Sequence, residues 1–182
     1  MEENNKVKRN NINIKGFIKE WIIPIISAIA IAFLINKFLF FNVVVPTGSM
    51  IPTINKNDKG LVSVIYNMNN IKRGDIIVFY SREFNELLIK RLIGLPGDNI
   101  EIKNGIVFVN GNQLEEDYVK NKDQFNGPGT YKVPAGKYFF LGDNRPNSAD
   151  SRFWKDPYVS SSDIKGKLQF RFYPFNNFGI VK

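Results

Sequence analysis

The strongest constraint on this chain is an apolar run of 21 residues near its amino terminus, from Trp21 to Phe41. The first 15 residues of the run, WIIPIISAIAIAFLI, carry no charge, and Lys37 is the only charged residue in the rest. At about 1.5 Å per residue, a helix of this length reaches roughly 30 Å, the thickness of the hydrocarbon core of a bilayer. We therefore predict a transmembrane helix over residues 21–41.

The residues around this run predict its orientation. Residues 1–20 are polar, and their cationic side chains are Lys6, Lys8, Arg9, Lys15 and Lys19. Because basic residues that flank a transmembrane helix stay in the cytoplasm, residues 1–20 are predicted to be a cytoplasmic segment and residues 42–182 an extracytoplasmic domain. Lys37 can extend its ammonium group to the outer interface. The chain is thus expected in the cell membrane as a single-pass protein, with the lipid bilayer as a partner.

Two other interpretations of the apolar run remain open. A cleavable secretory signal also begins with a basic region and an apolar stretch, although the residues that follow here, Asn42 and three valines, form no small-x-small cleavage site. A core helix of a soluble protein would carry a polar face, which residues 21–35 lack.

The residue inventory limits the chemistry of the chain. The 182 residues include no cysteine and no histidine. Disulfide scaffolds, cysteine nucleophiles, histidine bases and His/Cys zinc sites are therefore excluded, and acid–base chemistry must use Lys, Tyr, Asp or Glu. The net charge of +8 fits either nucleic acid or an anionic membrane surface. The predicted extracytoplasmic position disfavours nucleic acid as a partner, and nothing in the sequence indicates an oligomer.

Beyond the apolar run, the pattern predicts a mainly β domain. Short runs rich in Val, Ile, Phe and Tyr are separated by turn signals and span residues 60–66, 75–80, 87–94, 99–111, 137–142 and 165–174. Asn104-Gly105 lies between two such runs and is a strong hairpin signal. Residues 115–134 are polar and predict a loop. We expect a mixed or antiparallel sheet that coils like a barrel, because no segment after Phe41 keeps a helical period.

A serine and a lysine are the candidates for chemistry. Ser49 lies in PTGSM directly behind the apolar run, and alone it is interpreted most simply as a turn residue. Lys90 interrupts an apolar strand, where a solvent-facing lysine is the simpler interpretation. Without histidine, however, a serine hydroxyl needs another base, and a lysine buried among apolar groups can serve because burial lowers its pKa. Together the two residues predict a Ser-Lys hydrolase.

Other known site patterns do not fit. Pro52 stands where the S-x-x-K pattern would require a lysine after Ser49, and neither glycine-rich phosphate loop occurs. The spacing of the aspartates matches no calcium loop, so neither a metal nor a cofactor is predicted. The segment GDNRPNSADSR, residues 142–152, is too rich in charged and small polar residues for an average linker. By itself it is interpreted as a solvated ion-pair loop.

Four segments in a fixed order carry a resemblance to a known family. They are PTGSMIPTI (46–54), RGDIIVF (73–79), IKRLIGLPGD (89–98) and GDNRPNSADSR (142–152). With them the chain resembles the type I signal peptidases, membrane-bound serine proteases that remove signal peptides from exported proteins, in the compact form of Gram-positive bacteria. The resemblance covers the anchor and nearly all of the outer domain. It implies the β-rich catalytic domain of that family, with only a small second lobe at about residues 99–141.

The resemblance also implies roles for individual residues. Ser49 would be the nucleophile and Lys90 the general base, while the Ser49 N–H and the Thr47 hydroxyl would form the oxyanion hole. Ser148 would hydrogen-bond the lysine amine and orient it. A supporting ion-pair framework would consist of Asp143, Arg145, Asp150 and Arg152. Thr47 is a departure, since a serine is frequent at this position in the family.

The implied substrates are exported precursor proteins that carry a signal peptide, cut after small residues of the Ala-x-Ala type. An extended substrate would lie as a strand along a set of mainly apolar residues: Val43, Val44, Val45, Pro46, Met50, Leu88 and Ile89. Two alternatives remain. One is a relative of the self-cleaving repressor proteases, and the other is a membrane-anchored β domain that only binds a partner.

Overall fold

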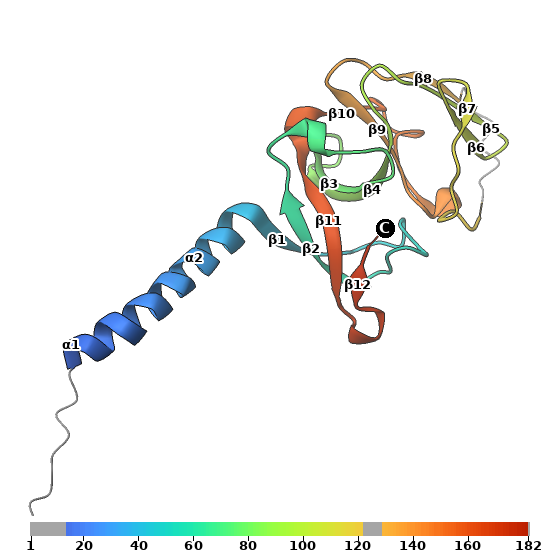
Figure 1. Cartoon of the computed structure of the whole chain (residues 1–182). Coiled ribbons are helices and arrows are strands. Elements are labelled where there is room, and N and C mark those ends of the chain that lie inside the picture. The colour runs from blue at the N-terminus through green and yellow to red at the C-terminus, as the bar shows by residue number, and fades with distance from the viewer. Residues whose placement is uncertain (1–13, 122–128, 182) are drawn as a thin grey trace, which may run out of the picture. The chain divides into compact units, whose positions relative to one another are not determined.

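The computed structural model describes residues 14–121 and 129–181 (Figure 1). Most of the predicted cytoplasmic segment, including Lys6, Lys8 and Arg9, lies outside the described residues, as do residues 122–128 of the predicted polar loop and Lys182. The chain divides into two compact units between Phe38 and Leu39. Each unit is described by itself.

The first unit is helical. It consists of α1 (Ile14–Phe17), a π-helical turn (Ile18–Ile22) and α2 (Ile23–Leu39). The last residue of α2, Leu39, is already the first residue of the second unit. Residues Lys15–Leu39 form one helical stretch of 25 residues with a mean hydropathy of 2.2 in its most apolar window, long and apolar enough to cross a membrane. Its apolar side chains are exposed, for example Ile29 and Phe33.

The helix ends earlier than the sequence predicts. Phe40 and Phe41, expected in the last helical turn, instead begin strand β1 (Phe40–Val44), where they pair with Ser63 and Val62 of β2 (Lys59–Val64). Apolar composition alone cannot separate the end of an apolar helix from the start of a half-buried strand, because both need large hydrophobic side chains. The predicted boundary at residue 41 is therefore two residues too late for the helix.

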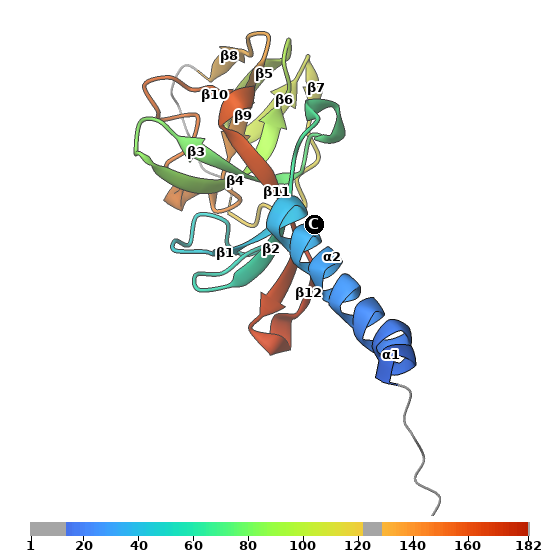
Figure 2. The ribbon, with the colours of Figure 1, turned by 90° about the vertical axis from the view of Figure 1, so that its left-hand side faces the viewer.

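The second unit is built mainly from an eight-stranded antiparallel sheet (Figure 1 and Figure 2). Its strand order is β1-β2-β11-β3-β4-β9-β10, with β12 on β11. Besides β1, the strands are β2 (Lys59–Val64), β3 (Ile76–Ser81), β4 (Glu86–Gly94), β9 (Lys137–Leu141), β10 (Val159–Ser160), β11 (Ile164–Tyr173) and β12 (Gly179–Ile180). Short 3-10 turns occupy Met68–Asn70, Arg145–Asn147, Ser161–Asp163 and Phe175–Asn177. The predicted fold class, mainly β after an apolar helix, is confirmed.

A second sheet, with four strands, lies within the range where a small second lobe is expected. Its order is β7-β6-β5-β8, with β5 (Asn99–Lys103), β6 (Ile106–Val109), β7 (Asn112–Gln113) and β8 (Thr130–Lys132). The predicted hairpin is present: Asn104 and Gly105 both have positive φ, 50° and 76°, as a type I′ turn requires. This sheet does not extend to residue 141, because β9 pairs with β4 in the large sheet. Strand β8 also lies inside the range that was expected to be a loop.

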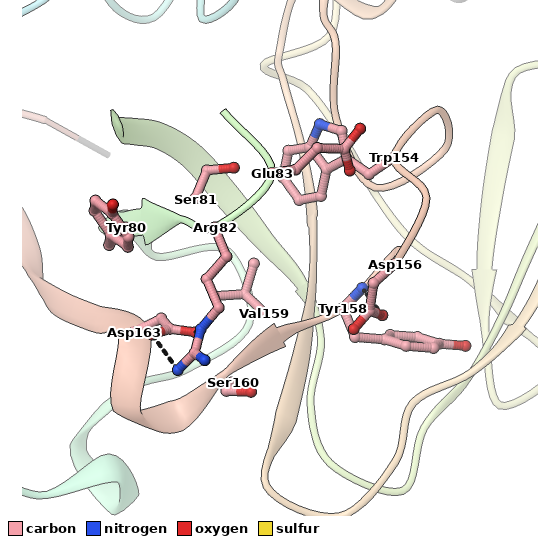
Figure 3. Close-up of a pocket in the computed structure, with 10 residues that line it drawn as sticks. All are labelled: Tyr80, Ser81, Arg82, Glu83, Trp154, Asp156, Tyr158, Val159, Ser160 and Asp163. Carbon is pink, nitrogen blue, oxygen red and sulfur yellow. Dashed lines mark hydrogen bonds and ion pairs between the residues drawn. The ribbon is translucent and has the colours of Figure 1, made fainter. Parts of the chain in front are cut away.

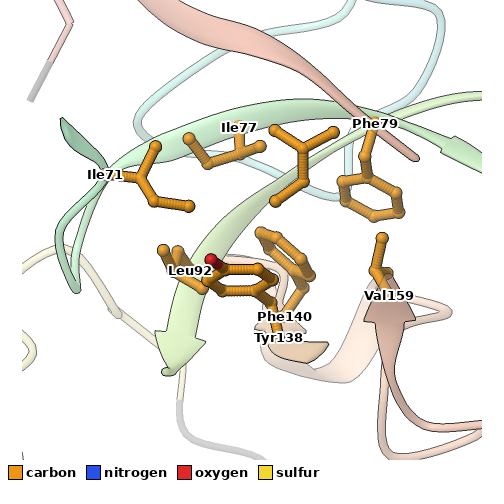
Figure 4. Close-up of a cluster of buried hydrophobic side chains, with 8 residues drawn as sticks. Ile71, Ile77, Phe79, Leu92, Tyr138, Phe140 and Val159 are labelled. Atoms are coloured by element: carbon orange, nitrogen blue, oxygen red, sulfur yellow. The ribbon is translucent and has the colours of Figure 1, made fainter. Parts of the chain in front are cut away.

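Strand β3 places two hydrophobic clusters on opposite faces of the large sheet. Its alternate residues Ile77 and Phe79 belong to one cluster, which also takes Leu92 from β4 and Phe140 from β9 (Figure 4). The Phe79 and Phe140 rings stack with centroids 4.5 Å apart. The other alternate residues, such as Val78, belong to a second cluster on the opposite face. Because side chains alternate along a strand, burial on both faces explains why β3 is apolar from Ile76 to Phe79.

The second cluster fixes the loop that follows β1. Its buried residues are Val45, Met50, Ile54, Val62, Ile76, Val78 and Leu168. The first three come from the loop itself, and the others come from β2, β3 and β11. Burying a side chain such as Met50 or Ile54 contributes about 1.5–3 kcal/mol. The loop between β1 and β2 is thus held against the sheet by its own apolar side chains.

Candidate active site

Ser49 lies in this anchored loop, close to the surface but largely covered. It is 7% exposed, and its neighbour Met50 is 1% exposed. Two backbone hydrogen bonds close the loop: Val45 N donates to Asp58 O at 2.9 Å, and Asn57 N donates to Val45 O at 2.7 Å. The position of Ser49 is therefore set by core packing on one side and by backbone pairing on the other.

Lys90 comes from the middle of β4 and meets Ser49 directly. It pairs with Ile77 of β3 in the sheet and is only 4% exposed. Its Nζ atom lies 2.6 Å from Ser49 Oγ, and the structure has the amine as donor. The two residues that the sequence singles out, 41 positions apart, are thus brought into hydrogen-bonding contact.

Burial lowers the pKa of the Lys90 amine from 10.5 to about 8. Loss of hydration is the main cause, since the charged ammonium form is the one that needs water most. The nearby charges act in both directions: Asp150 and Asp143 raise the pKa, and Arg152 lowers it. About half of the molecules would hold a neutral Lys90 at pH 8, against well under one in a hundred for an ordinary lysine.

This pair can transfer a proton from the hydroxyl to the amine. When Lys90 is neutral, the same 2.6 Å contact lets Ser49 Oγ donate its proton to Nζ, which activates the oxygen as a nucleophile. Thr47 lies beside the pair: its Oγ1 is 3.4 Å from Ser49 Oγ. The Thr47 side chain is exposed, so it can reach a bound molecule.

The segment 142–152 covers the pair, and Ser148 within it does not behave as expected. The Ser148 hydroxyl is buried and has no hydrogen-bond partner among the described residues, so the expected bond to the Lys90 amine is not formed. The amine is turned to Ser49 instead. Ser148 packs against Gly142, where a Cβ atom would lie 2.2 Å from Ser148 Oγ and 2.5 Å from the Ser49 carbonyl oxygen. Only glycine fits at position 142 without a shift of the Ser49 backbone.

All four residues of the expected ion-pair framework form ion pairs. Asp150 pairs with Arg152, through Arg152 Nε at 2.8 Å and Nη2 at 2.9 Å. Asp143 and Arg145 each pair with a residue outside the expected set. Asp143 binds Arg91 at 2.8 and 2.7 Å, whereas both terminal nitrogens of Arg145 donate to Glu116.

Sequence reasoning missed three residues of this site. Arg91 gave a signal, a second charge in an apolar strand directly after Lys90. Glu116 gave none, because it lies in a polar stretch among other acidic residues. Asn144 lies in the conspicuous segment 142–152, but nothing in the sequence distinguishes it from its polar neighbours. Its backbone N–H donates to the Ser49 carbonyl and its side-chain amide donates to the Gly48 carbonyl.

Two adjoining hollows open on Ser49 and Lys90. The first has a volume of about 110 Å³ and is lined by Val45, Pro46, Thr47, Ser49, Met50, Glu86, Leu87, Leu88, Ile89 and Lys90. The second adds Phe84, Asn147 and Ala149. Of the expected substrate-binding residues, Val43 and Val44 do not line either hollow: Val43 packs on the second cluster, and Val44 is exposed on the edge strand β1.

Another hollow lies beside the end of β3 and the turn that follows it (Figure 3). Arg82 reaches Asp163 across it and donates two hydrogen bonds, from Nε at 2.8 Å and from Nη2 at 3.0 Å. None of the predicted site residues lines this hollow. The arginine and the aspartate thus satisfy each other's hydrogen bonds.

Comparison with known proteins gives a consistent result. The family model described as "Signal peptidase, peptidase S26" matches residues 18–173. Signal peptidase I P of Bacillus subtilis subsp. natto is 42% identical over 178 residues, covering 90% of this chain and 92% of that protein. Signal peptidase I of Leptolyngbya laminosa is 43% identical over 144 residues, covering 74% and 70%. Signal peptidase I S of Bacillus subtilis (strain 168) is 36% identical over 181 residues, covering 93% and 97%.

Proposed function

Since the chain belongs to the signal peptidase family S26, we propose that it is a membrane-anchored signal peptidase I that uses a Ser49–Lys90 dyad to cut signal peptides from exported precursor proteins. The observation that carries the proposal is the buried 2.6 Å contact between Ser49 Oγ and Lys90 Nζ. In a chain without histidine, this contact supplies the base that a serine nucleophile needs.

Acylation follows from this contact. Neutral Lys90 accepts the Ser49 proton while Oγ attacks the scissile carbonyl carbon. The tetrahedral intermediate then collapses: the C–N bond breaks, the ammonium of Lys90 protonates the leaving amine, and the acyl group stays on Oγ as an ester. In the second half, Lys90 takes a proton from a water molecule that attacks the ester, and that proton returns to Ser49 Oγ as it leaves.

The developing oxyanion would be bound by the Ser49 N–H and the Thr47 hydroxyl. The Thr47 oxygen lies 3.4 Å from Ser49 Oγ, close enough for both to contact one carbonyl group. Loss of one such donor typically lowers the rate by about 10²- to 10³-fold. Asp143, Arg145, Asp150, Arg152 and the buried Ser148 would support the segment that covers the dyad, without contacting the substrate.

An extended precursor would lie in the two hollows beside the dyad. Val45, Pro46 and Met50 on one side and Leu88 and Ile89 on the other give the first hollow apolar walls, which suit small side chains one and three residues before the cut. Backbone pairing along the edge strand would supply the remaining binding. This arrangement supports cleavage after Ala-x-Ala, the specificity that the family resemblance implies.

The apolar helix would anchor the enzyme. It supports a topology with the amino terminus in the cytoplasm and residues after about 42 outside, where the signal-peptide cleavage site emerges. Confining enzyme and precursor to one bilayer would raise their effective concentration.

The test is cleavage of a defined precursor. Purified full-length protein in detergent is incubated with a precursor that carries an Ala-x-Ala site, and the product masses locate the cut. We expect Ser49→Ala and Lys90→Ala to abolish cleavage. The matched controls, Ser160→Ala and Lys103→Ala, alter the same residue types outside the two hollows.

Three results would contradict the proposal. Unchanged turnover by either folded dyad variant would refute the residue assignment. A wild-type protein that binds the precursor without cutting it at any pH would favour a binding module. A protein that cuts only its own chain would favour the kinship with self-cleaving repressor proteases.

A further inference from the structure

We propose that Asn144 is a positioning residue that holds the Gly48–Ser49 peptide plane so that the Ser49 N–H faces the substrate. The inference rests on the proposed function and concerns the same reaction. It assigns to Asn144 the task of forming the oxyanion hole before substrate arrives, without touching the substrate itself.

Asn144 binds two successive carbonyl groups of the nucleophile loop. Its side-chain Nδ2 donates to the Gly48 oxygen at 3.0 Å, and its backbone N donates to the Ser49 oxygen at 3.0 Å. The Gly48 oxygen also accepts a longer bond from Ile51 N at 3.2 Å. The oxygens on both sides of the Ser49 residue are therefore directed at Asn144, and the Gly48 oxygen also at Ile51 N within its own turn.

Because a peptide unit is planar, the direction of the Gly48 C=O determines the direction of the Ser49 N–H. Among the described residues, the cis peptide bonds are Ile51-Pro52 and Tyr173-Pro174, so the Gly48–Ser49 peptide is trans. In a trans peptide the C=O and the following N–H point in opposite directions. Holding the Gly48 oxygen toward Asn144 thus turns the Ser49 N–H to the opposite side. Within the described part of the chain this N–H donates to no other group, which leaves it free for an oxyanion.

Gly48 makes such a restraint necessary. Glycine has no Cβ and populates both signs of φ, so the peptide plane that follows it can rotate at little steric cost. A rotated plane would present the Gly48 carbonyl oxygen, a partial negative charge, where the N–H should meet the developing oxyanion. The hydrogen bond from Asn144 stabilises the productive orientation against this alternative.

Asn144 is itself oriented by its neighbours. Asn147 Nδ2 donates to Asn144 Oδ1 at 3.2 Å, which leaves the amide nitrogen, not the oxygen, to face Gly48. Asn147 N also donates to Asn144 O at 2.9 Å and closes the 3-10 turn. The turn is fixed further down by Arg145 Nε, which donates to Gly142 O at 3.0 Å. Asn144 thereby connects the segment that holds the buried ion pairs to the backbone of Gly48 and Ser49.

The test compares Asn144→Ala and Asn144→Asp with wild type in the full-length protein in detergent. Cleavage of the Ala-x-Ala precursor gives kcat, KM and the pH midpoint, and a peptide aldehyde of the same sequence, which forms a tetrahedral adduct on the serine, reports oxyanion binding. We expect kcat to fall by about 10- to 100-fold, part of what a lost oxyanion donor costs. KM should change less than about threefold, because substrate pairing along the strands is untouched.

The other readouts separate this role from a merely structural one. Affinity for the aldehyde should fall in parallel with kcat in both variants. In Asn144→Ala, which adds no charge, the pH midpoint should stay at its wild-type value, since the Lys90–Ser49 contact is intact. Asn144→Asp keeps the shape but places an acceptor against the Gly48 oxygen, so its kcat should fall at least as far. Asn67→Ala, which removes an asparagine bond to Asn69 N far from the dyad along the chain, should leave kcat unchanged.

The inference is overturned if a folded Asn144→Ala or Asn144→Asp protein keeps its kcat, or if only KM or the pH midpoint moves. The nearly isosteric Asn144→Asp variant answers the question if the alanine variant fails to fold. Failure of the proposed function is a different result, because the wild-type protein itself would then release no product.

Discussion

Replacing Lys90 with methionine should stabilise the protein while it abolishes catalysis. The folded-state pKa of Lys90, about 8, lies about 2.5 units below the value of 10.5 for a free lysine. At about 1.36 kcal/mol per unit, protonated Lys90 lowers the free energy of unfolding by about 3 kcal/mol. The sign follows because the unfolded chain binds this proton more tightly than the folded domain does.

The pH window is defined by the same two values. The cost is fully present below about pH 8, shrinks between pH 8 and 10.5, and is absent above 10.5, where both states are neutral. Methionine has a similar length and does not titrate. The lost hydrogen bond to Ser49 is worth about 1 kcal/mol and is nearly constant with pH. At pH 7, Lys90→Met should therefore be more stable than wild type by about 2 kcal/mol, since 3 is gained and 1 lost.

The assay is urea unfolding of both full-length proteins in the same detergent, followed by tryptophan fluorescence. Trp154 packs on Phe79 in the core, with ring centroids 5.9 Å apart, so its emission reports the loss of that packing. The advantage of the variant should fall by about 3 kcal/mol between pH 7 and pH 10.5. Tyrosine ionisation affects both proteins and cancels in the difference. A difference that stays constant over this range would refute the claim that the Lys90 amine is desolvated.

The remaining predictions concern activity, stability and specificity. In a pH profile, kcat/KM for the precursor should fall about tenfold per pH unit below about 8, because only neutral Lys90 can accept the Ser49 proton; a plateau down to pH 6 would point to a carboxylate base. Thr47→Val should lower kcat by about 10²- to 10³-fold whereas Thr47→Ser retains it, as measured by single-turnover cleavage; equal rates would exclude the Thr47 hydroxyl from the oxyanion hole. Glu116→Ala leaves the buried Arg145 charge without its carboxylate and should lower the free energy of unfolding by about 3–5 kcal/mol, against at most about 1 kcal/mol for Lys137→Ala in the more exposed Lys137–Asp156 pair; equal losses in urea unfolding would contradict the burial argument. Glu86 lines both hollows four residues before Lys90 on β4, about 13 Å along the strand. Precursors with a lysine about four residues before the cut should therefore be cleaved about three- to fivefold faster at low salt than those with a glutamate, and Glu86→Gln should remove the preference.

The parts of the fold that the sequence predicts are those decided by local patterns. The hairpin at Asn104-Gly105 needs only two residues that tolerate positive φ, and it is present. The apolar runs of β3 and β4 are enough to predict buried strands. The end of the helix cannot be predicted in this way, because Phe40 and Phe41 suit both an apolar helix and a half-buried strand. Only their pairing with β2 decides for the strand.

In the candidate site, too, local sequence predicts some residues and not others. Ser49 and Lys90 are unusual in their own neighbourhoods, a serine among turn residues behind an apolar run and a lysine inside an apolar strand. Glu116 is ordinary in its polar stretch, and Asn144 lies in the conspicuous segment 142–152 but is only one of several small polar residues there. The importance of both arises from long-range contacts, with Arg145 and with the Gly48 and Ser49 carbonyls. Ser148 shows the converse: a residue in a conspicuous motif whose expected bond is not formed in the folded chain.

The ion pairs beside the dyad have an electrostatic consequence for Lys90. Asp143 and Asp150 both raise the pKa of its amine, and unopposed carboxylates at these positions would keep the lysine charged and useless as a base. Each carboxylate is instead bound by a buried arginine at two oxygens, Asp143 by Arg91 and Asp150 by Arg152. Arg152 also lowers the pKa of Lys90 directly. Because the arginines pair with these carboxylates, the segment can contain aspartates and Lys90 can still be neutral through burial. One of the aspartates, Asp150, also accepts a hydrogen bond from the Gly142 N–H.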